Sequence, residues 1–334
     1  MLNSLKNVEA LNKLQKQLIT DDLNAKLKNK PIVRFEEFIS HMESKNIKFN
    51  IMDEEKAISI LHDMNYYYKL SCYKRNFKKI NGKYVNLEFS YLVDLASVDM
   101  QLRYLFIEAS LDIEHALKTH IMTDITNNKK VDGYKIIQSF VHSTTGTDNP
   151  VSIEKLMKNA SKSFHYQNDM YEKNKFNPSV WVLLEVMSFG DFLNFFTFYY
   201  ERNQSKNFQI SSIKGALYGV KKIRNAASHN NPFLINLAYL QLHNVNSYVE
   251  GYAKSLGIGE QIYKCSKIHD MLSLFFIHET FVKGNGSKKY RSDAFVKLIE
   301  KNKKRFSYLP IGNDVKIFFE IMDKVVDNYV SKLL

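Results

Sequence analysis

The sequence predicts an all-α fold, and two observations support the prediction. Its 334 residues include only 12 Gly and 5 Pro, too few for the many tight turns of a β-sandwich or barrel. Apolar residues recur at helical spacing through most of the chain, most clearly over residues 91–125. Hydrophobic residues make up 45% of the sequence, which argues against disorder, and a chain of this length can bury a sizeable core.

The first ninety residues are expected to alternate helices with interruptions. The expected elements are helices over residues 4–29, 34–45 and 54–64, and a strand or extended loop over residues 83–89. Apolar residues near 3.6-residue spacing support the helices, and Pro31 separates the first from the second. Asp53 is expected to cap the third helix. Short alternation of polar and apolar residues supports the strand.

Beyond residue 90 helical patterns dominate. Helices are expected over residues 91–125, 151–174, 209–230 and 234–256, with a further helix starting at Pro178. Residues 126–150 are rich in Asn, Thr, Gly and Lys and are therefore expected to include a loop. Residues 257–334 look like a separate helical segment broken at Gly284-Asn285-Gly286 and Pro310. The predicted organisation is an N-terminal helical segment (1–30), a helical domain (31–256) and a basic C-terminal helical appendage (257–334).

Composition limits the function classes. Lys and Arg number 47 against 35 Asp and Glu, and the net charge of +12 favours polyanionic partners. The two cysteines exclude a disulfide scaffold and a four-cysteine zinc site, and there is no phosphate-binding glycine loop, so we expect no metal and no cofactor. No apolar run approaches the roughly 18–20 residues of a bilayer span, and the N-terminus is no signal peptide, so we expect a cytoplasmic protein without membrane contact.

The candidate site is the run Arg224-Asn225-Ala226-Ala227-Ser228-His229. RNA can be cut without metal when its 2′-OH attacks the adjacent phosphate, which needs a base, an acid and positive charge on the phosphate. Histidine suits either proton-transfer role, and arginine binds phosphate oxygens through a charged fork. Asn225 and His229 are four residues apart on a helix, so the amide could orient the imidazole.

One histidine cannot readily be both acid and base. A two-fold homodimer would bring two copies of the motif together, and we therefore expect a homodimer. Taken alone the spacing is weak, since Arg34 and His41 have similar spacing. The alternative interpretation is a surface arginine with a capping histidine near Pro232.

Four sequence blocks sharpen the interpretation. They are KAISILHDMNYYYKLSCYKRNF (residues 56–77), FSYLVDLASVDMQLRYLFIEASLDIEHALKTHI (89–121), NPSVWVLLEVMSFGDF (177–192) and RNAASHN (224–230). In content and order they resemble the Abi family of phage abortive-infection proteins, of the AbiD/AbiF type. The matching features are an acidic residue before an arginine (Asp99…Arg103), an Ile-Glu pair (Ile113-Glu114), a Pro-x-x-Trp…Glu…Ser-Phe-Gly block and an Arg-Asn-x-x-x-His motif.

This resemblance implies an HEPN-like helical bundle, because the Abi family belongs to the HEPN superfamily of α-helical ribonucleases, which includes the type VI CRISPR effectors. Such proteins typically dimerise around the Arg…His motif, and some AbiF-like members are associated with a small structured non-coding RNA. Carried over by position, the catalytic set is Arg224, Asn225 and His229. Glu114 would hold Arg224 or His229, although it could equally be an ordinary surface carboxylate. The family often has a basic residue after the histidine, where this chain has Asn230-Asn231-Pro232.

Basic residues near the C-terminus predict an RNA-binding surface. Nine basic and two acidic residues occupy positions 283–305, with Tyr290, Phe306 and Tyr308 among them to stack bases. The predicted RNA contacts are Lys288, Lys289, Arg291, Lys297, Lys301, Lys303, Lys304 and Arg305, with Lys74 and Arg75 of an aromatic cluster over residues 66–77 as a second surface. A solvated lysine-rich helix face is the alternative. Trp181, Phe189, Phe192, Phe195 and Phe196 are expected in the core.

Together these features favour an abortive-infection ribonuclease that cuts single-stranded RNA without metal and leaves a 2′,3′-cyclic phosphate. Its partner would be RNA, including a cognate structured RNA that restrains it. A second hypothesis is an RNA-binding protein whose Arg…His motif is structural or contacts RNA without cleavage. A third, a helical protein–protein adaptor, leaves the excess positive charge unexplained.

Overall fold

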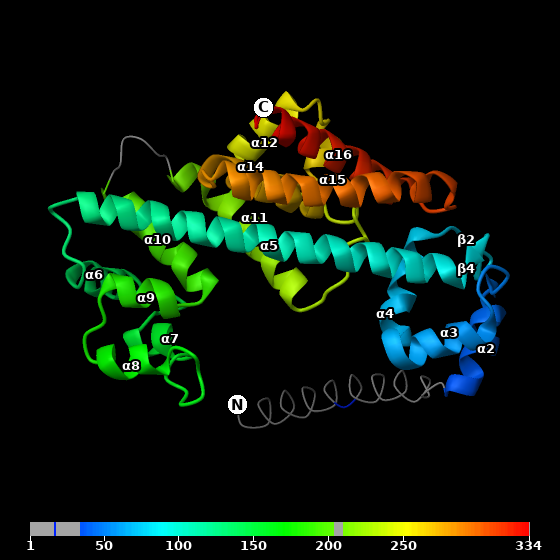
Figure 1. Cartoon of the computed structure of the whole chain (residues 1–334), viewed down its shortest axis with the longest axis horizontal. Helices are drawn as coiled ribbons and strands as arrows, with labels where there is room; N and C mark the ends of the chain where they lie inside the picture. Colours follow the sequence, from blue (N-terminus) through cyan, green and yellow to red (C-terminus); the bar gives the residue numbers. More distant parts are fainter. Residues whose placement is uncertain (1–16, 18–33, 204–209, 334) are drawn as a thin grey trace, which may run out of the picture. The chain divides into compact units, whose positions relative to one another are not determined.

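The computed structural model describes residue 17 and residues 34–203 and 210–333 (Figure 1). Nearly all of the described elements are helices, which confirms the all-α prediction. The chain divides into two compact units, Met1–Met64 with Lys79–Phe89, and Asn65–Lys78 with Ser90–Leu334. Apart from residue 17, the predicted N-terminal segment (1–30) and its helix over residues 4–29 lie outside the described residues.

The first unit contains two helical segments. Its helices are α2 (Phe35–Ser44) and α3 (Glu54–Ser59), and α3 continues into one π-helical turn, η1 (Ile60–Met64). The carboxylate of Asp53 accepts a hydrogen bond of 2.8 Å from the backbone N–H of Lys56, so the predicted N-cap is confirmed.

Short strands complete the first unit. They are β1 (Ile47–Lys48), β2 (Lys79–Ile80), β3 (Lys83–Tyr84) and β4 (Leu87–Glu88). Strand β1 pairs in parallel with β4, while β2 and β3 form a hairpin. The hairpin turns at Asn81 and Gly82, whose positive φ angles of 47° and 82° suit a two-residue turn. The predicted extended segment over residues 83–89 is thus β3 and β4.

The second unit is built from helices, of which α5 (Phe89–Asn127) is the longest at 39 residues (Figure 1). The other elements are α4 (Tyr67–Cys72), the 3₁₀ turn η2 (Tyr73–Asn76), α6 (Lys135–Ser143), α7 (Ile153–Met157), α8 (Asn168–Asn174), α9 (Val180–Val186), α10 (Phe189–Asn203), α11 (Ile210–Ser228), α12 (Ser247–Ser255), α13 (Glu260–Tyr263), α14 (Ser266–Phe281), α15 (Asn285–Tyr308) and α16 (Asn313–Ser331). None of these described helices is long and apolar enough to span a bilayer.

Residues 126–150 include non-helical segments on both sides of α6, whose Ile136, Ile137 and Phe140 form a buried helical face. Two expectations about individual elements were wrong. The helix expected over residues 151–174 is two short helices, α7 and α8, separated by turns. The helix expected over residues 234–256 is only α12, because backbone groups before it bond to Asp99, to Lys267 and to the backbone of residues 264–266.

Close contact between α11 and α14 fixes the position of α11 in the second unit. Gly219 of α11 permits it, since a Cβ atom there would lie 2.9 Å from both Cβ and Oγ of Ser273 on α14. Next to this contact, Lys222 donates hydrogen bonds of 3.1 Å to both carboxylate oxygens of Asp270. Burial raises the pKa of Asp270 to about 6, against the opposing effect of Lys222.

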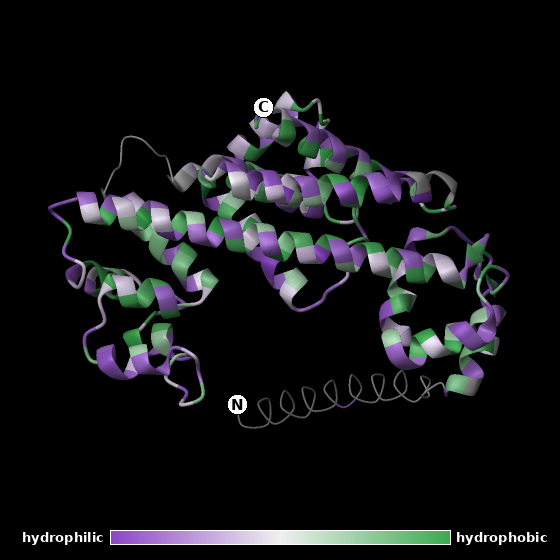
Figure 2. Ribbon diagram, viewed as in Figure 1, coloured by the Kyte–Doolittle hydropathy of each residue, from purple (hydrophilic) through white to green (hydrophobic). Residues whose placement is uncertain are grey.

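Residues 257–334 form α13 to α16 and belong to the same compact unit as residues 90–256. Arg291 on α15 binds the carboxylates of Asp112, at 2.8 Å, and Glu108 on α5. Helices α15 and α16 pack through Phe306 and Phe319, whose ring centroids are 4.5 Å apart. Hydrophilic and hydrophobic residues alternate along α15 (Figure 2), so one face can pack while lysines remain on another.

The buried carboxylate of Asp99 on α5 joins three segments of the second unit. One oxygen accepts hydrogen bonds from the Tyr73 hydroxyl, at 2.8 Å, and from Arg103. The other accepts from the backbone N–H groups of Phe233, at 2.7 Å, and Leu234, at 2.6 Å. Burial raises the pKa of Asp99, and these donors oppose that effect. The chain that follows α11 is therefore fastened to α5.

Replacing this carboxylate is expected to destabilise the protein strongly. In Asp99→Asn the buried guanidinium of Arg103 loses its charged partner, so the free energy of unfolding should fall by about 3–5 kcal/mol in urea denaturation. Glu172→Gln is the control, because it breaks an exposed ion pair with Lys175 and should leave the unfolding midpoint almost unchanged. Equal losses in the two variants would contradict the importance of the buried pair.

Two glycine substitutions should have opposite effects. Gly219→Ala places a methyl group against Ser273 and should lower the melting temperature of the protein, because α11 and α14 must move apart. Gly251→Ala, in α12, meets no atom within 4 Å and should raise stability by about 0.5–1 kcal/mol through helix propensity. Calorimetry of both variants tests the contact, and a stabilised Gly219→Ala variant would refute it.

Candidate active site

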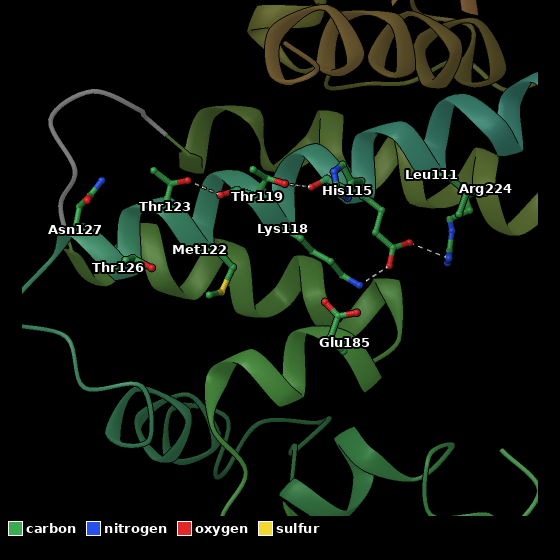
Figure 3. A pocket seen from close by; sticks show the side chains of 11 residues that line it. Leu111, His115, Lys118, Thr119, Met122, Thr123, Thr126, Asn127, Glu185 and Arg224 are labelled. Atoms are coloured by element: carbon green, nitrogen blue, oxygen red, sulfur yellow. Dashed lines mark hydrogen bonds and ion pairs between the residues drawn. The ribbon is translucent and has the colours of Figure 1, made fainter. Parts of the chain in front are cut away.

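A groove of about 720 Å³ runs along α5. One wall consists of side chains between residues 111 and 127 of α5, and Glu185 of α9 and Arg224 of α11 contribute to the other (Figure 3). The charged residues of its lining are two cations, Lys118 and Arg224, and two carboxylates, Glu114 and Glu185. The remaining lining residues are Leu111, His115, Thr119, Met122, Thr123, Thr126 and Asn127. The groove thus offers both charges and hydrogen-bonding groups to a polar ligand.

Glu114 organises the charged end of the groove. One carboxylate oxygen accepts a hydrogen bond of 3.0 Å from Nη2 of Arg224, and the other lies 3.1 Å from Nζ of Lys118 (Figure 3). All three side chains are partly buried, which strengthens the attraction relative to an exposed pair. The predicted contact between Glu114 and Arg224 is present in the structure.

The aromatic ring of Phe189 packs against the guanidinium group of Arg224. The guanidinium carbon of Arg224 lies 4.7 Å from the centroid of the buried Phe189 ring, which is a cation–π distance. Ser188 and Asp191 cap the start of α10 through bonds of 2.6 Å between their side chains and 3.2 Å from the Asp191 N–H to the serine hydroxyl. At Gly190 a Cβ atom would meet the flexible end of the Lys221 side chain. Within the Ser-Phe-Gly block, Phe189 contacts the motif arginine, and Ser188 caps the helix that carries Phe189.

The motif histidine lies where α11 ends. The N–H of Asn231 bonds to the carbonyl of Ala226 at 2.8 Å, and the N–H of Asn230 bonds to that of Ala227 at 3.0 Å. With φ of 58° at Asn230, this is a Schellman ending that makes His229 the C-cap residue. Asn230, the residue after the histidine, therefore adopts the left-handed conformation that ends the helix.

Lysine and aspartate hold the chain beyond this turn. Lys267 of α14 donates to the backbone carbonyls of Phe233 at 2.8 Å and Ile235 at 2.6 Å. Burial lowers the pKa of Lys267 to about 8, although Asp99 opposes the shift. Backbone N–H groups of this segment donate to Asp99, and its carbonyls accept from Lys267. These backbone groups are therefore hydrogen-bonded although the segment is neither helix nor strand.

The structure brings some predicted site residues together and separates others. Arg224 meets Glu114, whereas the exposed side chains of Asn225 and His229 make no hydrogen bond to each other or to another described residue. The predicted amide–imidazole contact is therefore absent from the described part of the chain. Both side chains remain accessible at the end of α11.

The predicted basic surface is only partly accessible. Arg291 is buried in its ion pairs with α5, Lys303 lies 2.8 Å from Asp323, and Arg305 lies 3.5 Å from Asp94. Lys288 donates to the carbonyl of Glu279. Lys289, Lys297 and Lys301 are exposed on α15, and Arg75 is exposed after α4, while Lys74 donates to the Tyr67 hydroxyl at 3.2 Å. The side chains of Lys304 and Tyr308 lie outside the described residues.

Two aromatic expectations change with the structure. Phe306 is buried against α16 and cannot stack a base, whereas Tyr290 is exposed. Trp181 was expected in the core together with Phe189, Phe192, Phe195 and Phe196, and those four phenylalanines are indeed buried. Trp181 is instead 47% exposed, and its ring packs against Gly133, where a Cβ atom would overlap it.

Lys118 and Glu185 are site residues that the sequence analysis missed. Lys118 follows Glu114 by four residues, which is the spacing of a helical ion pair and could have suggested it. Glu185 is the glutamate of the third block, but the sequence assigns it no role of its own. Among the described residues there is no group of three or more His, Cys, Asp or Glu side chains arranged to hold a metal ion.

A family model described as Abi-like protein matches residues 59–234, just over half of the chain. The chain belongs to this family. Membership indicates a role in abortive infection. No curated protein and no solved structure matches the chain.

The matched region of this Abi-like protein contains the contacts that hold Arg224 and the end of α11. It begins within α3 and finishes at Leu234, whose N–H group is bound by Asp99. Tyr73, Asp99, Glu114, Phe189 and Arg224 all lie within it, and their contacts converge on α11 and the turn that follows it. Helices α12 to α16 lie beyond the match.

A double-mutant cycle should detect the coupling between Glu114 and Arg224. Glu114→Gln and Arg224→Gln, alone and combined, should give an interaction free energy of about 0.5–2 kcal/mol in urea unfolding, because each variant removes the same partly buried ion pair. The control is a cycle between Glu114 and Lys214. Lys214 lies on α11 like Arg224, but its ammonium group is 3.7 Å from Glu201. If both cycles give no coupling, Glu114 does not hold the arginine.

Proposed function

We propose that this Abi-like protein is an HEPN-type endoribonuclease that acts in abortive infection. A homodimer would form a composite site from two copies of Arg224, Asn225 and His229, with Glu114 positioning each arginine. The 2′-OH of single-stranded RNA would attack the neighbouring phosphate, giving a 2′,3′-cyclic phosphate and a free 5′-hydroxyl.

The observation that best supports this proposal is the way Arg224 is held. One nitrogen of its guanidinium binds Glu114 and one face contacts Phe189, at the end of an open groove. An arginine has five N–H donors, so donors remain for a phosphate. A charge that is already positioned stabilises a pentacoordinate phosphorane without reorganisation during the reaction.

Proton transfer would fall to His229. Its side chain is exposed on the last turn of α11 and free of described partners, and it is five residues from Arg224. Acid and base catalysis together require two such groups, which a second copy of the chain supplies in a two-fold arrangement. Asn225, exposed one turn earlier, would orient one imidazole or contact the ribose.

RNA binding outside the groove would use exposed lysines. Lys289, Lys297 and Lys301 lie at spacings of eight and four residues along α15, so they project from one side of the helix. A structured RNA bound there would restrain the nuclease, as the family resemblance implies. Arg291 is excluded from this surface by its ion pairs.

Cleavage of RNA in EDTA tests the proposal. Wild-type protein should cut a mixed single-stranded RNA and leave 2′,3′-cyclic phosphate ends, whereas His229→Ala should cut at least about a hundredfold more slowly. His243→Ala, which removes an exposed histidine outside the motif, is the matched control and should cut at the wild-type rate.

The same experiment separates the proposal from its alternative. If wild type and His229→Ala bind RNA equally and neither cuts it, the motif serves RNA contact and the chain is a binding protein. Light scattering of the wild type should give twice the mass of the chain. A monomer that cuts RNA at full rate would overturn the composite site.

A further inference from the structure

Three aromatic side chains between α7 and α9 are almost fully exposed. Phe164 is 83%, Tyr166 105% and Phe176 90% exposed, whereas most of the phenylalanines in the helices are buried. Leaving large aromatic rings in water is unfavourable, and Phe164 and Tyr166 are both exposed only two residues apart, which is typical of a binding surface. We call residues 161–166, with the sequence SKSFHY, the aromatic turn.

The aromatic turn is an ordered feature. The N–H of His165 bonds to the carbonyl of Lys162 at 2.9 Å, and the His165 ring accepts a bond of 3.2 Å from the N–H of Gln167. The side chain of Asn168 donates to the carbonyl of Ala160 at 3.2 Å and so spans the turn. Phe164 and Tyr166 are therefore presented by a fixed backbone.

The surroundings of the aromatic turn are basic. Five lysines against two acidic residues occupy positions 155–175. Lys158 and Lys162 are exposed on the turn side, and the ammonium group of Lys175 lies 5.6 Å from the ring centroid of Phe176. Exposed rings combined with lysines and serine hydroxyls match the stacking platforms that bind single-stranded nucleic acids. Protein interfaces are also rich in aromatic side chains but poor in lysine, so the lysines around these rings favour a nucleic acid.

A hydrogen bond connects the aromatic turn to the groove. The side chain of Gln167 donates to the backbone carbonyl of Glu185 at 3.1 Å. Glu185 is the residue of α9 that lines the groove opposite Lys118 (Figure 3). The turn therefore adjoins the wall of the groove at whose charged end Arg224 is held.

We propose that the aromatic turn binds single-stranded RNA by stacking bases on Phe164 and Tyr166, and that the strand continues past Glu185 into the groove toward Arg224. The path of the strand toward Arg224 rests on the proposed ribonuclease function. RNA binding at the aromatic turn does not depend on cleavage. Stacking accepts any base, so the platform confers preference for single strands rather than for sequence.

Binding is tested in the full-length His229→Ala protein, so that cleavage does not consume the probe. Fluorescence anisotropy with a labelled oligouridine of about 12 nucleotides measures affinity. Changing both Phe164 and Tyr166 to Ala should weaken binding by at least about tenfold, because two stacked bases lose their platform. Changing both to Trp should restore it, and a duplex RNA of the same length should bind equally to all three proteins.

Tyr239→Ala is the matched control, because Tyr239 is 84% exposed on another segment of the same unit. It should leave affinity unchanged. All variants should keep the wild-type melting temperature, since the rings contribute little buried surface.

Unchanged oligouridine affinity in the double alanine variant would overturn the inference. So would a change in the oligomeric state of that variant, measured by light scattering, because the turn would then be a protein interface. If wild type does not cut RNA but the double alanine variant loses affinity, the ribonuclease proposal fails and the binding inference stands. If wild type cuts RNA and affinity is unchanged, the inference alone fails.

Discussion

The second unit depends most on the buried carboxylate of Asp99. Two of its hydrogen bonds come from side chains, Tyr73 and Arg103, and two from the backbone of the chain that leaves α11. An ion pair removed from water contributes little net stability by itself, but it penalises every arrangement that leaves one partner alone. The carboxylate therefore acts mainly by selecting one path for the segment at Phe233 and Leu234, and so it fixes where α11 ends.

A second carboxylate on the same helix completes this arrangement. Glu114 follows Asp99 by fifteen residues, which corresponds to about 22 Å along an α-helix and a similar angular position. Asp99 binds the segment after α11, and Glu114 binds Arg224 within α11, so α5 holds the end of α11 at two separate points. Lys267 and Phe189 contribute from α14 and α10. The end of α11, which carries the motif, is thus held by contacts with α5, α10 and α14.

The all-α fold class and helices with a regular apolar spacing can be predicted from the sequence. Helices α5 and α11 are therefore predicted to within two residues at each end. The errors fall where tertiary contacts replace local signals. Residues 234–245 have enough apolar residues for a helix, but their backbone bonds to Asp99 and Lys267 from distant helices. The pairing of Glu114 with Arg224 was predictable only through the family blocks, since 110 residues separate them. The exposure of Phe164 and Trp181 could not be predicted from the sequence, because large aromatic side chains are usually buried. Their exposure depends on how the surrounding helices pack.

The division of labour within the motif bears on the proposed chemistry. Arg224 is partly committed to structure, whereas Asn225 and His229 are exposed and have no described partners. A purely structural motif would be expected to bury or pair its histidine, and an isolated catalytic site would be expected to place its imidazole beside its arginine. Within the described residues of one copy, the histidine is exposed and is not hydrogen-bonded to the arginine. An exposed imidazole beyond an anchored guanidinium is what a site completed by a second copy requires, because each copy can then offer its histidine to a phosphate that the other copy's arginine helps to bind.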